Sequence, residues 1–187
     1  MAEDKDSVIV GLLSDKRNYR RAFEMIVQEY GESLYWKIRR FVLYHEDADD
    51  VLQNTFMKAW KNLDSFHGKS KLSTWLFSIA INESLNYVGK KKREEEALGS
   101  MSVAERLAAD SYFDGDKAQA LLYEAVSQLP DVQRTVFNLR YFDEMKYSEM
   151  SRLLSTSEGA LKASYHIAVK KIYGYLAEKG DFAVSED

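Results

Sequence analysis

The stretch that decides the fold runs Tyr147-Ser148-Glu149-Met150-Ser151-Arg152-Leu153-Leu154-Ser155-Thr156-Ser157-Glu158-Gly159-Ala160-Leu161-Lys162-Ala163-Ser164-Tyr165-His166. Its apolar residues recur at helical spacing on both sides of a short polar segment, so it predicts two short helices joined by a tight turn. This is the layout of a helix-turn-helix. The inner faces of the two helices would carry Met150, Leu153 and Leu154, then Leu161, Tyr165, Ala168 and Ile172.

The turn and the second helix of this motif indicate what it could bind. Ser155 stands where tight turns of this kind need a left-handed backbone, a conformation that glycine adopts most easily. If the motif reads duplex DNA, its second helix enters the major groove. The candidates for contact with base edges are Lys162, Ser164 and His166. The candidates for contact with phosphates are Lys170 and Lys171. A plain helical hairpin with solvated lysines is the alternative.

The rest of the chain also has helical spacing. It contains one proline in 187 residues, and strand-like alternation is hard to find. Apolar stripes run over residues 22–42 and 51–63, and Asp47, Asp49 and Asp50 precede the second stripe, where the helix dipole favours carboxylates. A hydrophobic content of 45% is enough to bury one or two cores. The predicted fold is therefore all-α, with two helical domains.

Composition excludes several classes of protein. The chain has no cysteine and only three scattered histidines, which rules out a disulfide framework and gives no metal-binding pattern. Its apolar runs fall far short of the roughly 20 residues that span a bilayer. The acidic start Met1-Ala2-Glu3-Asp4 has none of the features of a signal peptide. We expect a cytoplasmic protein without membrane insertion, metal or cofactor.

Catalysis is not expected either. Asp47, Asp49 and Asp50 could in principle hold a metal ion or act as a paired acid and base. However, no glycine-rich phosphate loop, nucleophile motif or further ligand set accompanies them. A helix cap or a protein-docking face suits these carboxylates better, so the chain is not expected to be an enzyme.

Charge is unevenly distributed along the chain. The net charge of -4 is awkward for a DNA-binding protein, because cations that contact phosphates normally supply most non-specific affinity. Residues 90–93 are nevertheless four consecutive cations, whereas residues 94–128 hold eight acidic and two basic residues, a net of -6. Residues 94–116 are therefore predicted to be a flexible acidic linker with a short helix around residues 103–107. The flanking domains would be residues 1–93 and 117–187, with Pro130 opening a helix over residues 131–141.

Aromatic and basic residues are interleaved in the second half of the first domain. Residues 64–71 break the helical spacing and read as a loop, and Ser73 or Thr74 would cap the next helix. Single-stranded DNA is typically bound by rings that stack on bases beside cations that follow the backbone. The rings are Phe66, Trp75, Phe77 and Tyr87, and the cations are Lys69, Lys71 and residues 90–93. Trp75 could equally be a core residue, whereas Phe66 lies in a polar loop.

A further motif is the run Asp47-Ala48-Asp49-Asp50-Val51-Leu52-Gln53-Asn54-Thr55-Phe56-Met57-Lys58-Ala59-Trp60. Together with the loop and helix of residues 66–82 and the terminal helix-turn-helix, it resembles the extracytoplasmic-function (ECF) class of bacterial sigma factors, in the sigma-70 family. The resemblance extends over residues 22–176. It implies that Asp50, Gln53 and Asn54 face the clamp helices of the largest subunit of core RNA polymerase. Asn54 stands where the class usually has glutamate.

The second motif is Phe66-His67-Gly68-Lys69-Ser70-Lys71-Leu72-Ser73-Thr74-Trp75-Leu76-Phe77-Ser78-Ile79-Ala80-Ile81-Asn82. In the class that it resembles, this loop and helix melt the minus-ten promoter element and hold a flipped base of the non-template strand. The resemblance points to Phe66 and Asn82 above all, in agreement with the aromatic and basic pattern. The full set that it implies is Phe66, Lys69, Trp75, Asn82, Asn86, Lys90, Lys91, Lys92 and Arg93.

The third motif is the helix-turn-helix itself, preceded by Leu129-Pro130. It resembles the domain of the class that reads the minus-35 element and packs on the flap of the second-largest polymerase subunit. Serine replaces the usual glycine at Ser155 and a frequent arginine at Ser164. The DNA-binding residues implied are Lys162, Ser164, Tyr165, His166 and Lys170. The class is usually held inactive by an anti-sigma factor, which joins core polymerase and promoter DNA as an expected partner.

Three functions are consistent with these observations. The first is a sigma factor that binds core RNA polymerase and directs promoter recognition and opening. The second is a sigma-like decoy that sequesters an anti-sigma factor, which would not need base-reading residues such as Phe66 and Asn82. The third is a stand-alone transcriptional regulator that uses only the helix-turn-helix, which would not need the first domain.

Overall fold

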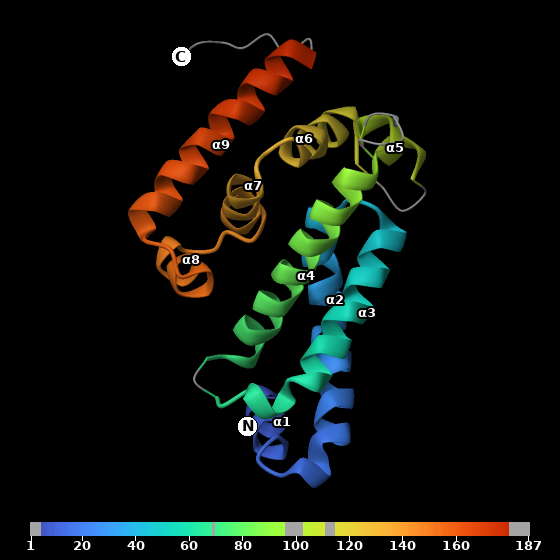
Figure 1. The fold of residues 1–187 in the computed structure, drawn as a ribbon, viewed down its shortest axis with the longest axis vertical. Coiled ribbons are helices and arrows are strands. Elements are labelled where there is room, and N and C mark those ends of the chain that lie inside the picture. The colour runs from blue at the N-terminus through green and yellow to red at the C-terminus, as the bar shows by residue number, and fades with distance from the viewer. Residues whose placement is uncertain (1–4, 69, 96–102, 111–114, 180–187) are drawn as a thin grey trace. The chain divides into compact units, whose positions relative to one another are not determined.

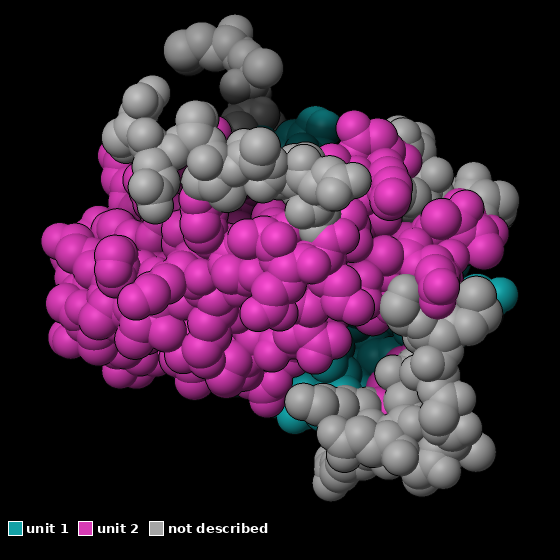
Figure 2. Space-filling view, turned by 90° about the horizontal axis from the view of Figure 1, so that it is seen from above, with its two compact units in different colours: residues 1–89 teal, residues 90–187 magenta. Residues whose placement is uncertain are grey.

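The computed structural model describes residues 5–68, 70–95, 103–110 and 115–179, and the side chains of residues 92–95 are outside this description (Figure 1). Every regular element in these ranges is helical, so the predicted all-α class is confirmed. The chain forms two compact units, residues 1–89 and 90–187, which Figure 2 colours separately. None of the described helices is long and apolar enough to cross a membrane.

The first unit begins with helix α1 (Lys5–Leu12), a short 3-10 turn η1 (Lys16–Asn18) and the long helix α2 (Tyr19–Val42). The apolar stripe of residues 22–42 continues unbroken through this one helix. Its inner face buries Ala22, Ile26, Leu34 and Ile38 completely or nearly so. Burial of the leucine and isoleucine side chains stabilises the fold by about 1.5–3 kcal/mol each.

A tight reversal leads from α2 to helix α3 (His45–Lys61). Leu43 ends α2 in a left-handed conformation, with φ of 70°, and its backbone N–H donates to the Arg39 carbonyl at 2.9 Å. The buried face of α3 carries small residues, among them Ala48 and Ala59. Because small side chains let two helices approach closely, α3 packs along α2.

A second 3-10 turn, η2 (Leu63–Ser65), precedes the loop and helix α4 (Leu72–Glu95). The helix begins at Leu72, so the expectation that Ser73 or Thr74 caps it was wrong: both lie within its first turn. Leu72 and Leu76 are buried against the first unit. The Tyr87 hydroxyl donates to the Asp47 carboxylate at 2.6 Å and joins the second half of α4 to the start of α3.

In the second unit, helix α5 (Val103–Ala109) packs on helix α6 (Lys117–Ser127). The short helix expected within residues 94–116 is thus confirmed. Leu107 of α5 is 1% exposed, and the backbone N–H of Ala104 donates to the buried Glu124 carboxylate at 3.3 Å. The described part of the acidic segment therefore packs on α6 and is hydrogen-bonded to it.

Helix α7 (Asp131–Phe137) follows Pro130, which occupies the cap position. A π-helical turn, η3 (Asn138–Phe142), extends it, so the helical segment ends one residue beyond the predicted limit of 141. The core beneath it is a cluster that α6, α7 and the last helix share. Its members are Ala125, Val126, Leu129, Phe137, Ala168 and Ile172.

The helix-turn-helix consists of α8 (Tyr147–Leu154) and α9 (Glu158–Lys179). Between them Ser155 has φ of 50° and ψ of 40°, the left-handed conformation that the sequence predicted. At this turn a residue with a Cβ is less favourable than glycine by roughly 1 kcal/mol. The Ser157 hydroxyl then accepts from the Ala160 N–H at 3.3 Å and caps α9.

Candidate nucleic-acid and polymerase interface

One face of α3 projects polar side chains into solvent. Asp50, Gln53 and Asn54 are all exposed, and Met57, which is 47% exposed, extends the same face. These spacings place the four residues within about 100° of one another around the helix axis. The face combines one carboxylate, two amides and an apolar contact, a composition suited to docking on another protein.

The other two aspartates at the start of α3, Asp47 and Asp49, have partners within the first unit. Asp47 is 7% exposed and accepts from Tyr87, as described above. Asp49 lies 3.4 Å from the ring nitrogen Nε2 of His45, whose Nδ1 contacts the Tyr35 hydroxyl at 2.7 Å. Within the described ranges no group of three or more acidic or histidine side chains could hold a metal ion.

The loop after η2 and the start of α4 meet through two aromatic rings. The centroids of Phe66 and Trp75 lie 5.4 Å apart, with the ring planes tilted by 49°. Both side chains are half-buried, so neither belongs fully to the core. Gly68, two residues after Phe66, has φ of 68° and turns the loop back towards α4. This contact brings together two of the four rings that the sequence analysis named.

Polar residues continue from Trp75 along the same side of α4. Asn82 and Asn86 are exposed and, by helical register, lie within about 20° of the direction of Trp75. Lys90 is exposed one turn further along the helix. The stripe therefore begins with two rings, continues with two amides and reaches a cation, which is the combination that binds an unpaired nucleic-acid strand.

Two of the predicted aromatic residues lie elsewhere. Phe77 is two residues from Trp75, about 200° around the helix, and its ring is 4.6 Å from the Lys37 ammonium of α2. The Tyr87 hydroxyl contacts Asp47 instead of solvent. The grouping of these two rings with Phe66 and Trp75 was therefore wrong.

The predicted cations are only partly described. Lys71 and Lys90 are exposed, and Lys91 is half-buried. Lys69 and the side chains of Lys92 and Arg93 fall outside the described residues. Their assignment to DNA contact stays a prediction.

On α9 the predicted DNA-binding residues separate into two groups. Lys162, His166 and Lys170 are exposed and lie within about 80° of one another around the axis. Ser164 is half-buried and, two residues from Lys162, points to a different side. The first three residues form the face that a major groove could accept, whereas Ser164 lies on the other side of the helix, so its grouping with them was wrong.

The Tyr165 ring packs against the core of the second unit. The ring stacks on that of Phe137, with centroids 5.9 Å apart and planes 15° from parallel. Burial raises the pKa of the Tyr165 hydroxyl above its usual value. A side chain held in this way can reach DNA only through its hydroxyl edge.

Two residues near the start of the recognition helix were missed by sequence reasoning. The Lys162 ammonium lies 5.5 Å from the centroid of the Tyr147 ring, and the Arg140 guanidinium lies 5.4 Å from the same centroid. Lys162 also lies 3.8 Å from the Glu158 carboxylate. Tyr147 and Glu158 thus contact the ammonium of Lys162 on the predicted DNA-binding face, and both residues belong to the helix-turn-helix motif.

An apolar groove of 530 Å³ opens on the second unit between α6, η3 and α9. Its wall includes Leu122, Phe142 and Leu176, and the rims carry Tyr141 and Tyr173, each about half exposed. The groove is assembled from three helical segments far apart in sequence. No single motif could therefore have indicated it.

Comparisons with known proteins agree with this geometry. The family model described as "Sigma-70 region 2" matches residues 26–94, and "Sigma-70, region 4" matches residues 119–172. The first range contains the α3 face and the stripe on α4. The second contains α8, most of α9 and part of the groove lining.

Similar proteins of the same kind occur in several bacteria. The ECF RNA polymerase sigma factor SigW of Bacillus subtilis is 30% identical, over 81% of this chain and 87% of its own length. The RNA polymerase sigma-H factor of Pseudomonas aeruginosa is 28% identical, over 87% and 89% respectively.

Two solved structures have similar folds, both at 25% identity. CnrH in complex with the cytosolic domain of CnrY has a TM-score of 0.65 and covers 95% of this chain and 100% of its own. The sigma factor RpoE of Bartonella quintana, bound to the anti-sigma factor NepR, has a TM-score of 0.64 and covers 83% of this chain and 96% of its own.

Proposed function

Because this chain belongs to the ECF class of sigma-70 RNA polymerase sigma factors, we propose a specific role for each of its exposed surfaces. Its function is to direct RNA polymerase to promoters. The observation that carries the residue assignments is the stripe on α4, where the Phe66–Trp75 ring pair precedes exposed amides and a cation. A protein that only docked on other proteins would have no use for such a stripe.

The exposed face of α3 docks on the clamp helices of the largest core subunit. Asp50, Gln53 and Asn54 make the polar contacts, and Met57 adds apolar area. Support comes from their shared exposure and from the anchoring of the start of α3 to Tyr87 through Asp47. A rigid helix with a preformed face loses little entropy on docking.

The stripe on α4 melts the minus-ten element. Phe66 and Trp75 supply the ring surface for a base that leaves the duplex, and Asn82 supplies an amide for its edge. Asn86 and Lys90, with Lys69, Lys91, Lys92 and Arg93, would contact the backbone of the same strand. Unstacking a base costs a few kcal/mol, which contacts with these rings and the amide offset.

The helix-turn-helix reads the minus-35 element through the face of Lys162, His166 and Lys170. Tyr147 and Glu158 orient the Lys162 ammonium before DNA arrives. Three cations or polar groups on one helix give weak duplex affinity, and the chain carries a net charge of -4. Core polymerase therefore supplies most of the non-specific attraction to DNA.

The domain limits follow the same division of labour. Residues 1–93 form the core-binding and minus-ten domain, residues 94–116 connect the two domains, and residues 117–187 form the minus-35 domain.

The groove of the second unit accepts an apolar helix from the flap of the second-largest subunit, since its walls are apolar and its rims carry tyrosines. An anti-sigma factor is a further partner, by analogy with the complex of RpoE and NepR.

Catalysis has no place in this proposal. The chain contributes binding energy to promoter opening, and the polymerase performs the chemistry. No side chain of the described ranges belongs to a potential metal cluster, and no cofactor is required. Core RNA polymerase works in the cytoplasm of bacteria, so we place the chain there too.

Transcription in vitro tests the proposal. Core polymerase with this chain should produce transcripts from a limited set of genomic fragments, and core alone should not. A decoy would bind an anti-sigma factor and yield no transcript. A stand-alone regulator would protect duplex DNA without core polymerase, which the proposal excludes.

A further inference from the structure

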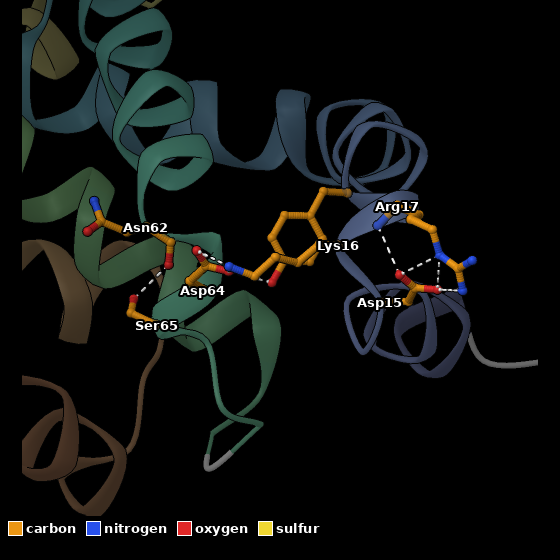
Figure 3. A network of polar contacts seen from close by, with 7 residues as sticks. Asp15, Lys16, Arg17, Asn62, Asp64 and Ser65 are labelled. Atoms are coloured by element: carbon orange, nitrogen blue, oxygen red, sulfur yellow. Dashed lines mark hydrogen bonds and ion pairs between the residues drawn. The ribbon is translucent and has the colours of Figure 1, made fainter.

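The turn before Phe66 is attached to a distant part of the first unit. Asp64, in the middle of η2, receives a hydrogen bond from the Tyr19 hydroxyl at 2.7 Å. The Lys16 ammonium lies 2.9 Å from the same carboxylate (Figure 3). Lys16 belongs to η1 and Tyr19 opens α2, so one carboxylate joins the segment around residue 64 to two residues more than forty positions earlier.

The turn itself is well defined by its backbone. The N–H of Ser65 donates to the Asn62 carbonyl at 2.9 Å, and the N–H of Phe66 donates to the Leu63 carbonyl at 3.1 Å. Leu63 is 2% exposed and fixes the turn to the core. A displacement of Asp64 is therefore transmitted directly to Phe66, two residues later.

Among the described residues, the far side of the loop offers Phe66 no comparable contact at Gly68. At Gly68 a Cβ would meet no atom within 4 Å, so the loop crosses open space there. Phe66 is consequently oriented by two groups of contacts: the Trp75 ring on one side and the Asp64 anchor on the other.

We propose that Asp64 is a positioning residue for promoter opening, which through Lys16 and Tyr19 holds Phe66 where the unpaired minus-ten base arrives. This inference rests on the proposed function of the α4 stripe. Asp64 itself does not contact DNA. Its effect is exerted through the direction in which Phe66 presents its ring.

The electrostatics of the anchor agree with this role. The hydrogen bonds from Lys16 and then from Tyr19 hold the pKa of the Asp64 carboxyl below its usual value. The same contact raises the pKa of Lys16 and of Tyr19. The ion pair is exposed, and such pairs contribute little to global stability. Loss of the anchor should therefore change loop geometry without unfolding the unit.

The direction of the change in DNA affinity distinguishes two explanations. Removing an acidic side chain close to bound DNA ordinarily strengthens binding, because a phosphate repulsion disappears. If Asp64 positions Phe66, removing it should instead weaken capture of the unpaired strand. The two explanations therefore predict opposite changes in affinity.

The experiment uses holoenzyme reconstituted from core polymerase and full-length chain. The probe is a single-stranded oligonucleotide with the non-template minus-ten sequence of a promoter that the wild-type holoenzyme opens. Asp64→Ala should lower its affinity roughly fivefold, while affinity for core polymerase stays unchanged. Tyr19→Phe should cause a smaller loss, and the double variant should be no worse than Asp64→Ala alone, since both act through one contact.

Two variants complete the design. Asp15 is a nearby acid that pairs with Arg17 inside η1 and does not hold the loop, so Asp15→Ala should leave oligonucleotide affinity at or above the wild-type level. The exchanged pair Lys16→Asp with Asp64→Lys should recover most of the affinity lost in Asp64→Ala.

Three results would be decisive against the inference. Unchanged or increased affinity of the Asp64→Ala holoenzyme would overturn the positioning role, and the stripe on α4 would keep its proposed function. An equal loss in Asp15→Ala would show that the effect is not specific to the Asp64 contact and would also overturn it. Failure of the wild-type holoenzyme to bind the oligonucleotide would overturn the function of the stripe and the inference with it.

Discussion

The Phe66 ring lies 5.4 Å from the Trp75 ring, at the point where the loop after η2 meets α4. Phe66→Ala removes one of the two rings and should lower promoter opening roughly fivefold to 150-fold, because the extruded base loses a stacking surface worth about 1–3 kcal/mol. Asn82→Ala should act in the same direction. Permanganate reactivity of unpaired thymines in the minus-ten element measures the effect. Phe66→Tyr keeps the ring and is the matched control, and equal reactivity in Phe66→Ala and wild type would refute the assignment.

Lys162 tests the minus-35 assignment. Lys162→Ala should weaken footprint protection of that element by the holoenzyme about threefold to tenfold, the range expected for one lost contact to DNA. Lys171 is exposed on the same helix, half a turn away from Lys162, and Lys171→Ala is the control. If both variants gave the same footprint, the face of α9 that meets DNA would have been wrongly assigned.

The turn of the helix-turn-helix carries a strained residue. Ser155→Gly should raise the free energy of unfolding of the second unit by about 0.5–1 kcal/mol, because glycine adopts the observed φ of 50° without a Cβ penalty. Ser155→Val should lower it, since a β-branched side chain tolerates that conformation poorly. Chemical denaturation measures both changes. A glycine variant less stable than wild type would show that the serine is not strained.

The pKa of Tyr175 predicts how the stability of the second unit changes at alkaline pH. Burial, together with its hydrogen bond to Glu124, raises the pKa of the Tyr175 hydroxyl to about 12. In the unfolded chain the tyrosine hydroxyl has its ordinary pKa of about 10. The stabilisation from the neutral hydroxyl is therefore fully present below pH 10 and is lost as the pH rises towards 12.

Denaturation of the wild type and Tyr175→Phe at several pH values checks this response. The excess stability of the wild type should shrink between pH 10 and 12. Tyr173 on the same helix is 51% exposed, and Tyr173→Phe provides the comparison. A constant difference between wild type and Tyr175→Phe over that interval would contradict the linkage.

The features that the sequence predicted correctly depend on local chemistry. The left-handed Ser155 follows from the length of the turn, and the short helix α5 follows from residues adjacent in the chain. Resemblance to the sigma-70 family then gave each segment a function.

The features that it missed depend on register and distance. Phe77 and Ser164 were grouped with neighbours two residues away, although two residues correspond to about 200° of helix rotation. The contact of Asp64 with Lys16 joins residues 48 positions apart, and no sequence pattern in either segment indicates it. The groove beside Tyr173 likewise requires three packed segments.

The most direct test of the account is the affinity of labelled protein for purified bacterial core RNA polymerase. Asp50→Ala with Gln53→Ala should lower it at least a hundredfold without changing the circular dichroism spectrum, because both side chains are exposed. Glu24→Ala with Gln28→Ala removes the same two functional groups from the exposed face of α2 and should bind as tightly as wild type. Equal affinity of the Asp50/Gln53 variant and the wild type, or no binding by the wild type, would contradict the account.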